Sequence, residues 1–170
     1  MAHETIIVLD FGSQYTQLIA RRLRELSIFS EIWAPDTPAE AIRARRPAGV
    51  ILSGGPKSVS DQGAPACDPA VFDAGIPVLG ICYGMQLMAH SLGGRVAPAP
   101  QREYGHATVA LANNGPGKPL FAEVPHELRV WASHGDFVSV PPEGFSVVAT
   151  SANAPVPAMA NASKRLYALL

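Results

Sequence analysis

Apolar residues in the first half of the chain follow two alternating patterns. Short runs rich in apolar and β-branched residues suit strands buried on both faces of a parallel sheet, and they cover residues 5–9, 29–33, 49–53 and 77–81. The segments between and after them predict helices, the first of which has apolar residues at helical spacing, over residues 15–26, 38–45, 70–74 and 85–92. This alternation predicts a parallel sheet with helices on both faces.

The pattern changes after Arg95. Short apolar stretches separated by Gly, Pro and Asn predict further strands near residues 96, 108–111, 128–131, 137–140 and 146–150. Two last runs, 156–160 and 165–170, predict a hairpin. We therefore expect one α/β domain over residues 1–170, with a mostly parallel, flavodoxin-like sheet and a C-terminal antiparallel extension. The final run reaches Leu170 without a polar ending, so we also expect that the domain is truncated there.

Composition limits the classes of function. The 170 residues carry a net charge of −1, which gives no electrostatic footprint for nucleic acid or an anionic membrane. Two cysteines are too few for a disulfide framework, and they form no C-x-x-C pair for zinc, so we expect no metal site. There is no signal-peptide pattern and no apolar segment near the roughly 20 residues of a membrane helix. These observations favour a soluble, cytoplasmic protein.

The most informative motif is the segment Gly80–Gly84, which reads G-x-C-x-G between a predicted strand and a predicted helix. This is the cysteine counterpart of the nucleophile elbow, in which glycines allow a sharp turn that exposes the central side chain. Cys82 would then lie at a helix N-terminus, where the helix dipole favours a thiolate. The second cysteine, Cys67, lies in a proline-rich stretch without an elbow and is interpreted as incidental.

A nucleophile that attacks a carbonyl needs donors for the oxyanion that forms. The backbone N–H of Tyr83 directly follows the nucleophile and is one candidate. Gly55 is the second, because the Ser53–Pro56 turn ends a neighbouring predicted strand and glycine permits a close backbone approach. An ordinary strand-to-helix turn explains Ser53–Pro56 equally well from these residues alone.

The general base is not identified by the residues. His3 is terminal, His90 lies two turns along the predicted elbow helix, and His106 and His126 lie in loop-like surroundings. His134 belongs to the polar cluster of residues 131–136, and both a structural role and a role as base stay open for it. No pattern in the sequence places His134 beside Cys82.

Several of these motifs resemble one family. Residues 80–86 (GICYGMQ) and 53–56 (SGGP) are similar to the class I, or triad, glutamine amidotransferases. The opening segment 9–22, the REYG segment 102–105 and the cluster 131–136 narrow the resemblance to the amidotransferase domains of the GMP synthase family. The resemblance covers essentially the whole chain, with the motifs in the same order.

The resemblance implies that Cys82 attacks the side-chain amide of glutamine, releases ammonia and forms a γ-glutamyl thioester that water hydrolyses. It implies an oxyanion hole formed by the backbone of Gly55 and Tyr83. It also implies a glutamine site formed by Gln86, Ser133, His134, Gly135 and Asp136. No cofactor is expected in this domain.

In the family, ammonia passes to an ATP-pyrophosphatase synthetase domain, in cis or in trans, that uses ATP and Mg to aminate XMP to GMP. The resemblance implies this partner domain, which residues 1–170 do not contain, and a homodimer could form through it.

One departure from the family is important. The family's base and its orienting acid lie in a His-Pro-Glu motif that follows a strand ending in Tyr-x-x-x-Phe. Here the corresponding strand is 165–170, and residues 1–170 contain no His-Pro-Glu. We therefore expect these residues alone to turn glutamine over poorly.

Other interpretations of these motifs fit the residues to different degrees. The opening motif and Tyr83 argue against the amidotransferases of anthranilate or carbamoyl phosphate synthesis, and Tyr83 disfavours peptidase or deglycase chemistry, which would want a histidine there. A non-catalytic glutamine-binding or regulatory module of the same fold stays open. A dinucleotide-binding Rossmann site is excluded, because residues 10–13 contain no G-x-G-x-x-G.

Overall fold

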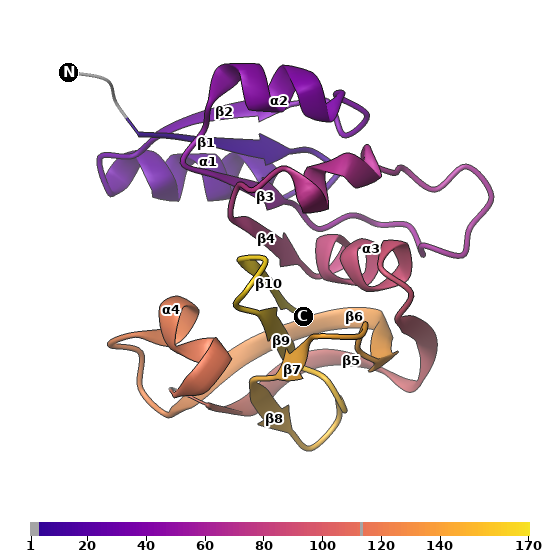
Figure 1. The fold of residues 1–170 in the computed structure, drawn as a ribbon. Helices are drawn as coiled ribbons and strands as arrows, with labels where there is room; N and C mark the ends of the chain where they lie inside the picture. The colour runs from indigo at the N-terminus through magenta and orange to yellow at the C-terminus, as the bar shows by residue number, and fades with distance from the viewer. Residues whose placement is uncertain (1–3, 113) are drawn as a thin grey trace.

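Two sheets organise the protein, which a computed structural model describes over residues 4–112 and 114–170 (Figure 1). The larger sheet has the strand order β2-β1-β3-β4-β10-β9-β7. Its strands are β1 (Thr5–Leu9), β2 (Phe29–Trp33), β3 (Gly49–Leu52), β4 (Val78–Ile81), β7 (Ser146–Val147), β9 (Ala158–Asn161) and β10 (Leu166–Leu169). The five strands from β2 to β10 are mutually parallel, β9 runs antiparallel to β10, and β7 pairs antiparallel with β9. The predicted mostly parallel sheet is confirmed.

Helices cover both faces of the larger sheet, as predicted. They are α1 (Thr16–Glu25), α2 (Ala39–Arg45), the 3-10 helix η1 (Pro69–Asp73) and α3 (Tyr83–Ser91). In Figure 1, α1 and α2 lie on opposite sides of β1 and β2. Ile42 of α2, Phe72 of η1 and Met88 of α3 share one core cluster with Leu9 and Leu52 of the sheet. Among the described residues, no helix is long and apolar enough to cross a membrane.

Helix α1 forms where its apolar spacing predicts it, but small residues face the sheet. Thr16 and Ala20 are buried, whereas Leu18 is 44% exposed and Leu26 is 71% exposed. The side-chain hydroxyl of Ser30 in β2 donates to the carbonyl oxygen of Ala20 at 2.9 Å. This hydrogen bond brings helix and strand close together, which leaves room only for small side chains at the contact.

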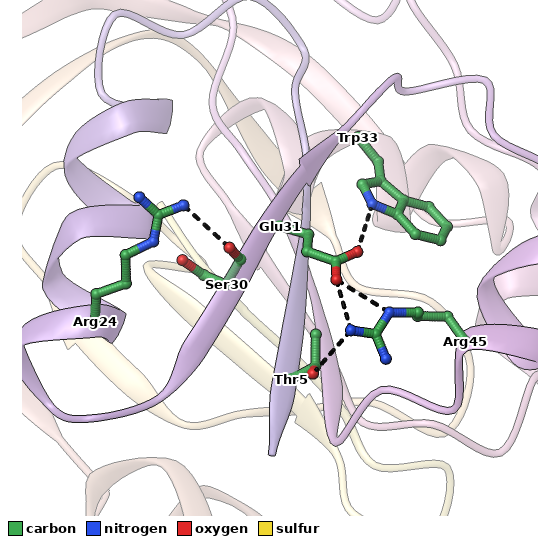
Figure 2. Close-up of polar contacts among 6 residues, drawn as sticks. All are labelled: Thr5, Arg24, Ser30, Glu31, Trp33 and Arg45. Atoms are coloured by element: carbon green, nitrogen blue, oxygen red, sulfur yellow. Dashed lines mark hydrogen bonds and ion pairs between the residues drawn. The ribbon is translucent and has the colours of Figure 1, made fainter. Parts of the chain in front are cut away.

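A polar cluster fixes β2 against α2 at the edge of the sheet (Figure 2). Arg45, the last residue of α2, donates to Glu31 Oε1 through both Nε (3.0 Å) and Nη2 (2.6 Å). The indole N–H of Trp33 donates to the other carboxylate oxygen at 2.9 Å. The Arg45 guanidinium also reaches the hydroxyl of Thr5 in β1, at 3.4 Å. The ion pair of Glu31 with Arg45 therefore joins β2 to α2, and the Arg45 guanidinium extends the contact to β1.

The second half contains a long hairpin, whereas the sequence predicted several short strands. Strands β5 (Arg95–Leu111) and β6 (Glu127–Val140) pair antiparallel across a register irregularity between Pro98 and Glu103, so pairing continues through residues expected in loops. His106, expected in a loop, lies in β5. Its ring packs against that of Trp131 in a T-shaped arrangement, with the ring centroids 5.1 Å apart. The short helices η2 (Gly115–Gly117) and α4 (Lys118–Phe121) connect the two strands.

The predicted strand 146–150 is divided between the two sheets. Its first part is β7 of the larger sheet, and its second part begins β8 (Ala149–Ser151), which pairs with β5 in the smaller sheet of order β6-β5-β8. Val148, between them, is buried in a second core cluster with Phe121 and Ala158. The antiparallel extension therefore contributes to both sheets.

The final hairpin is confirmed, and its second strand reaches the predicted elbow. Strand β10 pairs antiparallel with β9 and parallel with β4, with Leu169 opposite Ile81. The backbone N–H of Cys82 donates to the carbonyl oxygen of Leu169 at 2.8 Å. The carboxyl end of β10 therefore lies beside the candidate nucleophile.

Candidate functional site

Cys82 occupies a sharp turn between β4 and α3, as the G-x-C-x-G motif predicts. Its φ and ψ angles are 50° and −106°, a backbone conformation that non-glycine residues rarely adopt. The carbonyl oxygen of Cys82 accepts the N–H of Gln86 at 3.0 Å, so α3 begins immediately after the cysteine. Backbone strain of this kind is concentrated at functional sites, where the surrounding fold maintains it.

The two glycines of the motif are required by space. A Cβ atom on Gly80 would lie 2.7 Å from the backbone carbon of Gly84, on the facing turn of α3. A Cβ atom on Gly84 would lie 2.7 Å from the Cβ of Leu52 and would also overlap the carbonyl oxygen of that residue. The absence of a side chain at Gly80 therefore lets β4 turn closely into α3, and its absence at Gly84 lets α3 pack against β3.

A polar pocket of about 370 Å³ opens at Cys82 and brings most of the predicted site residues together. Its lining contains Gly55, Cys82, Gln86, Ser133, His134, Gly135 and Asp136, all predicted from the sequence. It also contains Pro56, Lys57, Ser58, Asp61 and Tyr104, which were not predicted. The pocket is therefore formed by the turn after β3, the elbow and the long hairpin.

A second cavity, of about 520 Å³, also reaches Cys82. It shares Gly55, Pro56 and Ser133 with the polar pocket, and it is bounded further by Ser13, Tyr15 and Leu170 among others. The opening motif of the chain therefore contributes to the surroundings of the nucleophile. Asp10 Oδ1 shapes this motif by accepting the backbone N–H of Gly12 at 2.9 Å and the hydroxyl of Thr16 at 2.8 Å.

The two residues expected to supply oxyanion donors are both near the nucleophile. Tyr83 is the first residue of α3, and Gly55 lines the polar pocket with Cys82. A Cβ atom on Gly55 would lie 2.6 Å from the carbonyl oxygen of Phe11, so only glycine fits against that residue, and its role as oxyanion donor stays a prediction. Tyr83 itself does not line the polar pocket and is only 1% exposed.

Gln86 links the elbow helix to the long hairpin. Its side chain is 4% exposed, and the amide nitrogen Nε2 donates to the backbone carbonyl oxygen of Asp136 at 3.0 Å. Because the backbone N–H of Gln86 is hydrogen-bonded to the Cys82 carbonyl oxygen, this contact fixes the position of the Asp136 backbone relative to the nucleophile. The amide therefore has a structural use that the sequence did not predict.

The pKa of the Cys82 thiol is raised above its usual value. Burial is the main cause, and the nearby Asp136 carboxylate adds to it, whereas the backbone N–H of Tyr83 acts in the opposite direction. The expected preference for a thiolate at the helix N-terminus is therefore present but is outweighed, because burial disfavours the charged form. Burial also raises the pKa of Cys67, to about 11, and this cysteine is part of the core.

The structure places the candidate histidines. His134 lies in β6, is largely buried, and lines the same polar pocket as Cys82, a proximity that no sequence pattern indicated. His90, His106 and His126 line neither this pocket nor the second cavity, and His3 lies outside the described residues. Within the described part of the chain, no three His, Cys, Asp or Glu side chains gather to hold a metal ion.

The unpredicted lining residues had weak signals in the sequence. Lys57, Ser58 and Asp61 belong to a stretch rich in Ser, Pro and Ala that indicates only a loop. Tyr104 belongs to the REYG segment, which supported the resemblance without indicating a place in the site. The side chains of Arg102 and Glu103 in that segment lie outside the described residues.

Comparisons with known proteins agree with this geometry. The sequence model of the family "Glutamine amidotransferase class-I" matches residues 7–169. The chain is 53% identical over 167 residues to the glutamine-hydrolysing GMP synthase of Syntrophomonas wolfei, and 53% identical over 167 residues to that of Geobacillus kaustophilus. These alignments cover 98% of this chain and 32% of each relative, so the chain spans about a third of their length.

The fold is shared with solved structures as well. A Thermoplasma acidophilum protein, provisionally described as one of the subunits of a GMP synthase, superposes with a TM-score of 0.85 at 28% identity, covering 99% of this chain and 83% of that one. The family match, the shared flavodoxin-like architecture and the cysteine elbow lead to one assignment. The chain belongs to the class I glutamine amidotransferase family.

Proposed function

We propose that this domain hydrolyses the side-chain amide of glutamine and supplies the ammonia for the amination of XMP to GMP. The observation that carries the proposal is the strained cysteine, which lies at a G-x-C-x-G elbow where a polar pocket and a second cavity meet. Family membership and the GMP synthases among its relatives support the choice of reaction.

The proposed chemistry proceeds in two balanced steps. The Cys82 sulfur, as thiolate, attacks the amide carbon, and the carbonyl oxygen becomes an oxyanion that the backbone N–H groups of Gly55 and Tyr83 stabilise. The carbon–nitrogen bond then breaks, and the nitrogen leaves as ammonia after it takes up a proton. Water next attacks the γ-glutamyl thioester, which yields glutamate and regenerates the thiol.

Substrate recognition is proposed to use the charges of the polar pocket. Glutamine carries an α-ammonium and an α-carboxylate group, and the pocket offers the half-buried Asp136 to the first and Lys57 to the second. The hydrogen bond from Gln86 to the Asp136 carbonyl oxygen holds the backbone that carries this carboxylate. The zwitterion would also reduce the effect of Asp136 on the pKa of Cys82, because the ammonium group neutralises its charge.

The raised pKa of Cys82 makes a general base necessary, since few thiols ionise unaided near neutral pH. Residues 1–170 contain no His-Pro-Glu, so we propose that these residues alone turn glutamine over slowly. The parallel pairing of β10 with β4 places Leu170 beside Cys82, where the family's motif would enter the site.

The remaining proposals concern the whole protein. Since the relatives are about three times longer than this chain, we propose an ATP-pyrophosphatase synthetase domain, in cis or in trans, as the partner that receives the ammonia. ATP and Mg would bind to that domain. A homodimer formed through it and a cytoplasmic location also belong to the proposal.

The test is glutamate and ammonia release from L-glutamine by the wild-type chain, by Cys82→Ala and by Cys67→Ala. We expect slow release by the wild type, equal release by Cys67→Ala and none by Cys82→Ala. Equal release by all three variants would show that Cys82 is not the nucleophile. Glutamine binding without any release would favour the non-catalytic module instead.

A further inference from the structure

The Tyr83 side chain has a role that the proposed chemistry does not use. The chemistry requires only its backbone N–H, yet its ring is almost completely buried and its hydroxyl donates to the carbonyl oxygen of Pro65 at 2.6 Å. Pro65 is the last residue of the segment 56–65, which is part of the connection from β3 to η1 and whose Lys57, Ser58 and Asp61 line the polar pocket. A single hydrogen bond thus connects this loop to the first residue of the elbow helix.

The Tyr83 ring is also linked, through Phe11, to Gly55, the other candidate oxyanion donor. The ring centroids of Tyr83 and Phe11 lie 5.5 Å apart, and the Phe11 carbonyl oxygen packs against the α-carbon of Gly55. The backbone N–H of Phe11 donates to the Ser53 hydroxyl at 2.9 Å, and that hydroxyl donates to the Gly54 carbonyl oxygen at 2.9 Å. Phe11 therefore contacts both the Tyr83 ring and the Ser53–Pro56 turn.

We propose that the Tyr83 side chain is a positioning residue for the oxyanion hole, which it holds through its hydroxyl bond to Pro65 and its ring contact with Phe11. The inference deepens the proposed glutamine hydrolysis and rests on it. It also makes the 56–65 loop a place from which a bound partner or substrate could alter the oxyanion hole.

The turn at Cys82 is strained. Cys82 has a positive φ, so the peptide that carries the Tyr83 N–H would relax if the helix start were free to move. A buried hydrogen bond and a ring contact on the next side chain oppose that relaxation. Oxyanion donors act through their fixed direction, and small misplacements of them lower rates strongly.

The test separates oxyanion chemistry from the other properties of the cysteine. L-Glutamate γ-hydroxamate has a better leaving group than ammonia, so at alkaline pH its hydrolysis depends less on a general base or acid. Iodoacetamide alkylates the same thiolate by direct substitution and forms no oxyanion. Burial, with Asp61 and Cys67 nearby, raises the pKa of Tyr83, so its hydroxyl stays a donor under these conditions.

Tyr83→Phe removes the hydroxyl and keeps the ring, and Tyr167→Phe in β10 is the matched control. We expect Tyr83→Phe to lower kcat for the hydroxamate by about tenfold, with little change in KM and an unchanged limiting rate of iodoacetamide alkylation at high pH, where the Cys82 thiol is fully ionised. The pH midpoint of alkylation should move upward, because the Tyr83 N–H also lowers the pKa of Cys82. Tyr167→Phe should leave all of these unchanged. Phe11→Leu, which weakens the ring contact, should give the same pattern, and it serves as the second variant if Tyr83→Phe does not fold.

The outcomes are distinct. Normal hydroxamate turnover by both Tyr83→Phe and Phe11→Leu, or a loss matched by an equally slower limiting alkylation rate at high pH, would overturn the positioning role and leave the proposed function intact. No turnover by the wild type, or turnover that persists in Cys82→Ala, would instead contradict the proposed function on which the inference rests.

Discussion

Replacing Gly84 by alanine tests the geometry of the elbow in the simplest way. The added methyl group would lie 2.7 Å from the Cβ of Leu52 and would overlap the carbonyl oxygen of the same residue. The overlapping atoms are backbone atoms or are attached directly to the backbone, so no rotation of a side chain can relieve them. Helix α3 and strand β3 would have to move apart.

The magnitude follows from these distances. Ordinary contacts begin at 3.4 Å, so the helix and strand must separate by roughly 0.7 Å at least. Overpacking of this kind costs about 3 kcal/mol at the upper end of the usual range, whereas alanine gains about 1 kcal/mol over glycine in a helix. The net loss is about 2 kcal/mol, which for a domain of this size lowers Tm by roughly 4–8 °C.

The assay is thermal unfolding followed by circular dichroism, with Gly54→Ala as the matched control. A methyl group at Gly54 would lie 3.5 Å from the Ser13 hydroxyl and 3.7 Å from the Cys82 Cβ, which are ordinary contacts. Gly54→Ala should therefore keep a Tm close to that of the wild type. A Gly84→Ala variant as stable as the wild type, or more stable, would refute the claim that this turn needs glycine for space.

Three further predictions follow from the charges and hydrogen bonds. Hydrogen bonding to Arg45 lowers the pKa of Glu31, so the stabilising effect of the Glu31 carboxylate should be complete above the ordinary glutamate pKa and be lost as pH falls through the lower pKa of the folded state. The free energy of urea unfolding should therefore depend less on pH in this range for Glu31→Gln than for the wild type, and an equal dependence would contradict this. Asp136→Asn should shift the pH profile of Cys82 alkylation to lower pH, and an unshifted profile would exclude the electrostatic effect. Gln86→Met removes the donor to the Asp136 carbonyl oxygen, so it should lower the free energy of unfolding by about 1–2 kcal/mol and raise KM for glutamine. An unchanged urea midpoint and an unchanged KM would show that the hydrogen bond is dispensable.

The elbow and the first half of the fold could be predicted because their signals are local. Runs of β-branched residues located β1 to β4, and Gly80 and Gly84 marked the sharp turn around Cys82. The structure adds the reason for each glycine. For Gly84 that reason involves Leu52, about thirty residues away, so no local pattern contains it, whereas Gly80 is crowded by Gly84 itself.

The hairpin and the pocket could not be predicted in the same way. The resemblance placed His134 and its neighbours at the site, but the pairing of β5 with β6 crosses a register irregularity, and only tertiary contact reveals that Tyr104 also belongs to the walls of the pocket at Cys82. The ionisation of Cys82 was misjudged for a related reason. Its helix N-terminus is visible in the sequence, but its burial and its proximity to Asp136 are not.

The central claim is that Cys82 is a nucleophile at a glutamine site. The most direct measurement is mass mapping of the protein after incubation with a cysteine-reactive glutamine analogue, with and without excess L-glutamine. The account predicts a single adduct on Cys82, suppressed by L-glutamine, and no adduct on the buried Cys67. Absence of the Cys82 adduct, or labelling that glutamine does not suppress, would contradict the account.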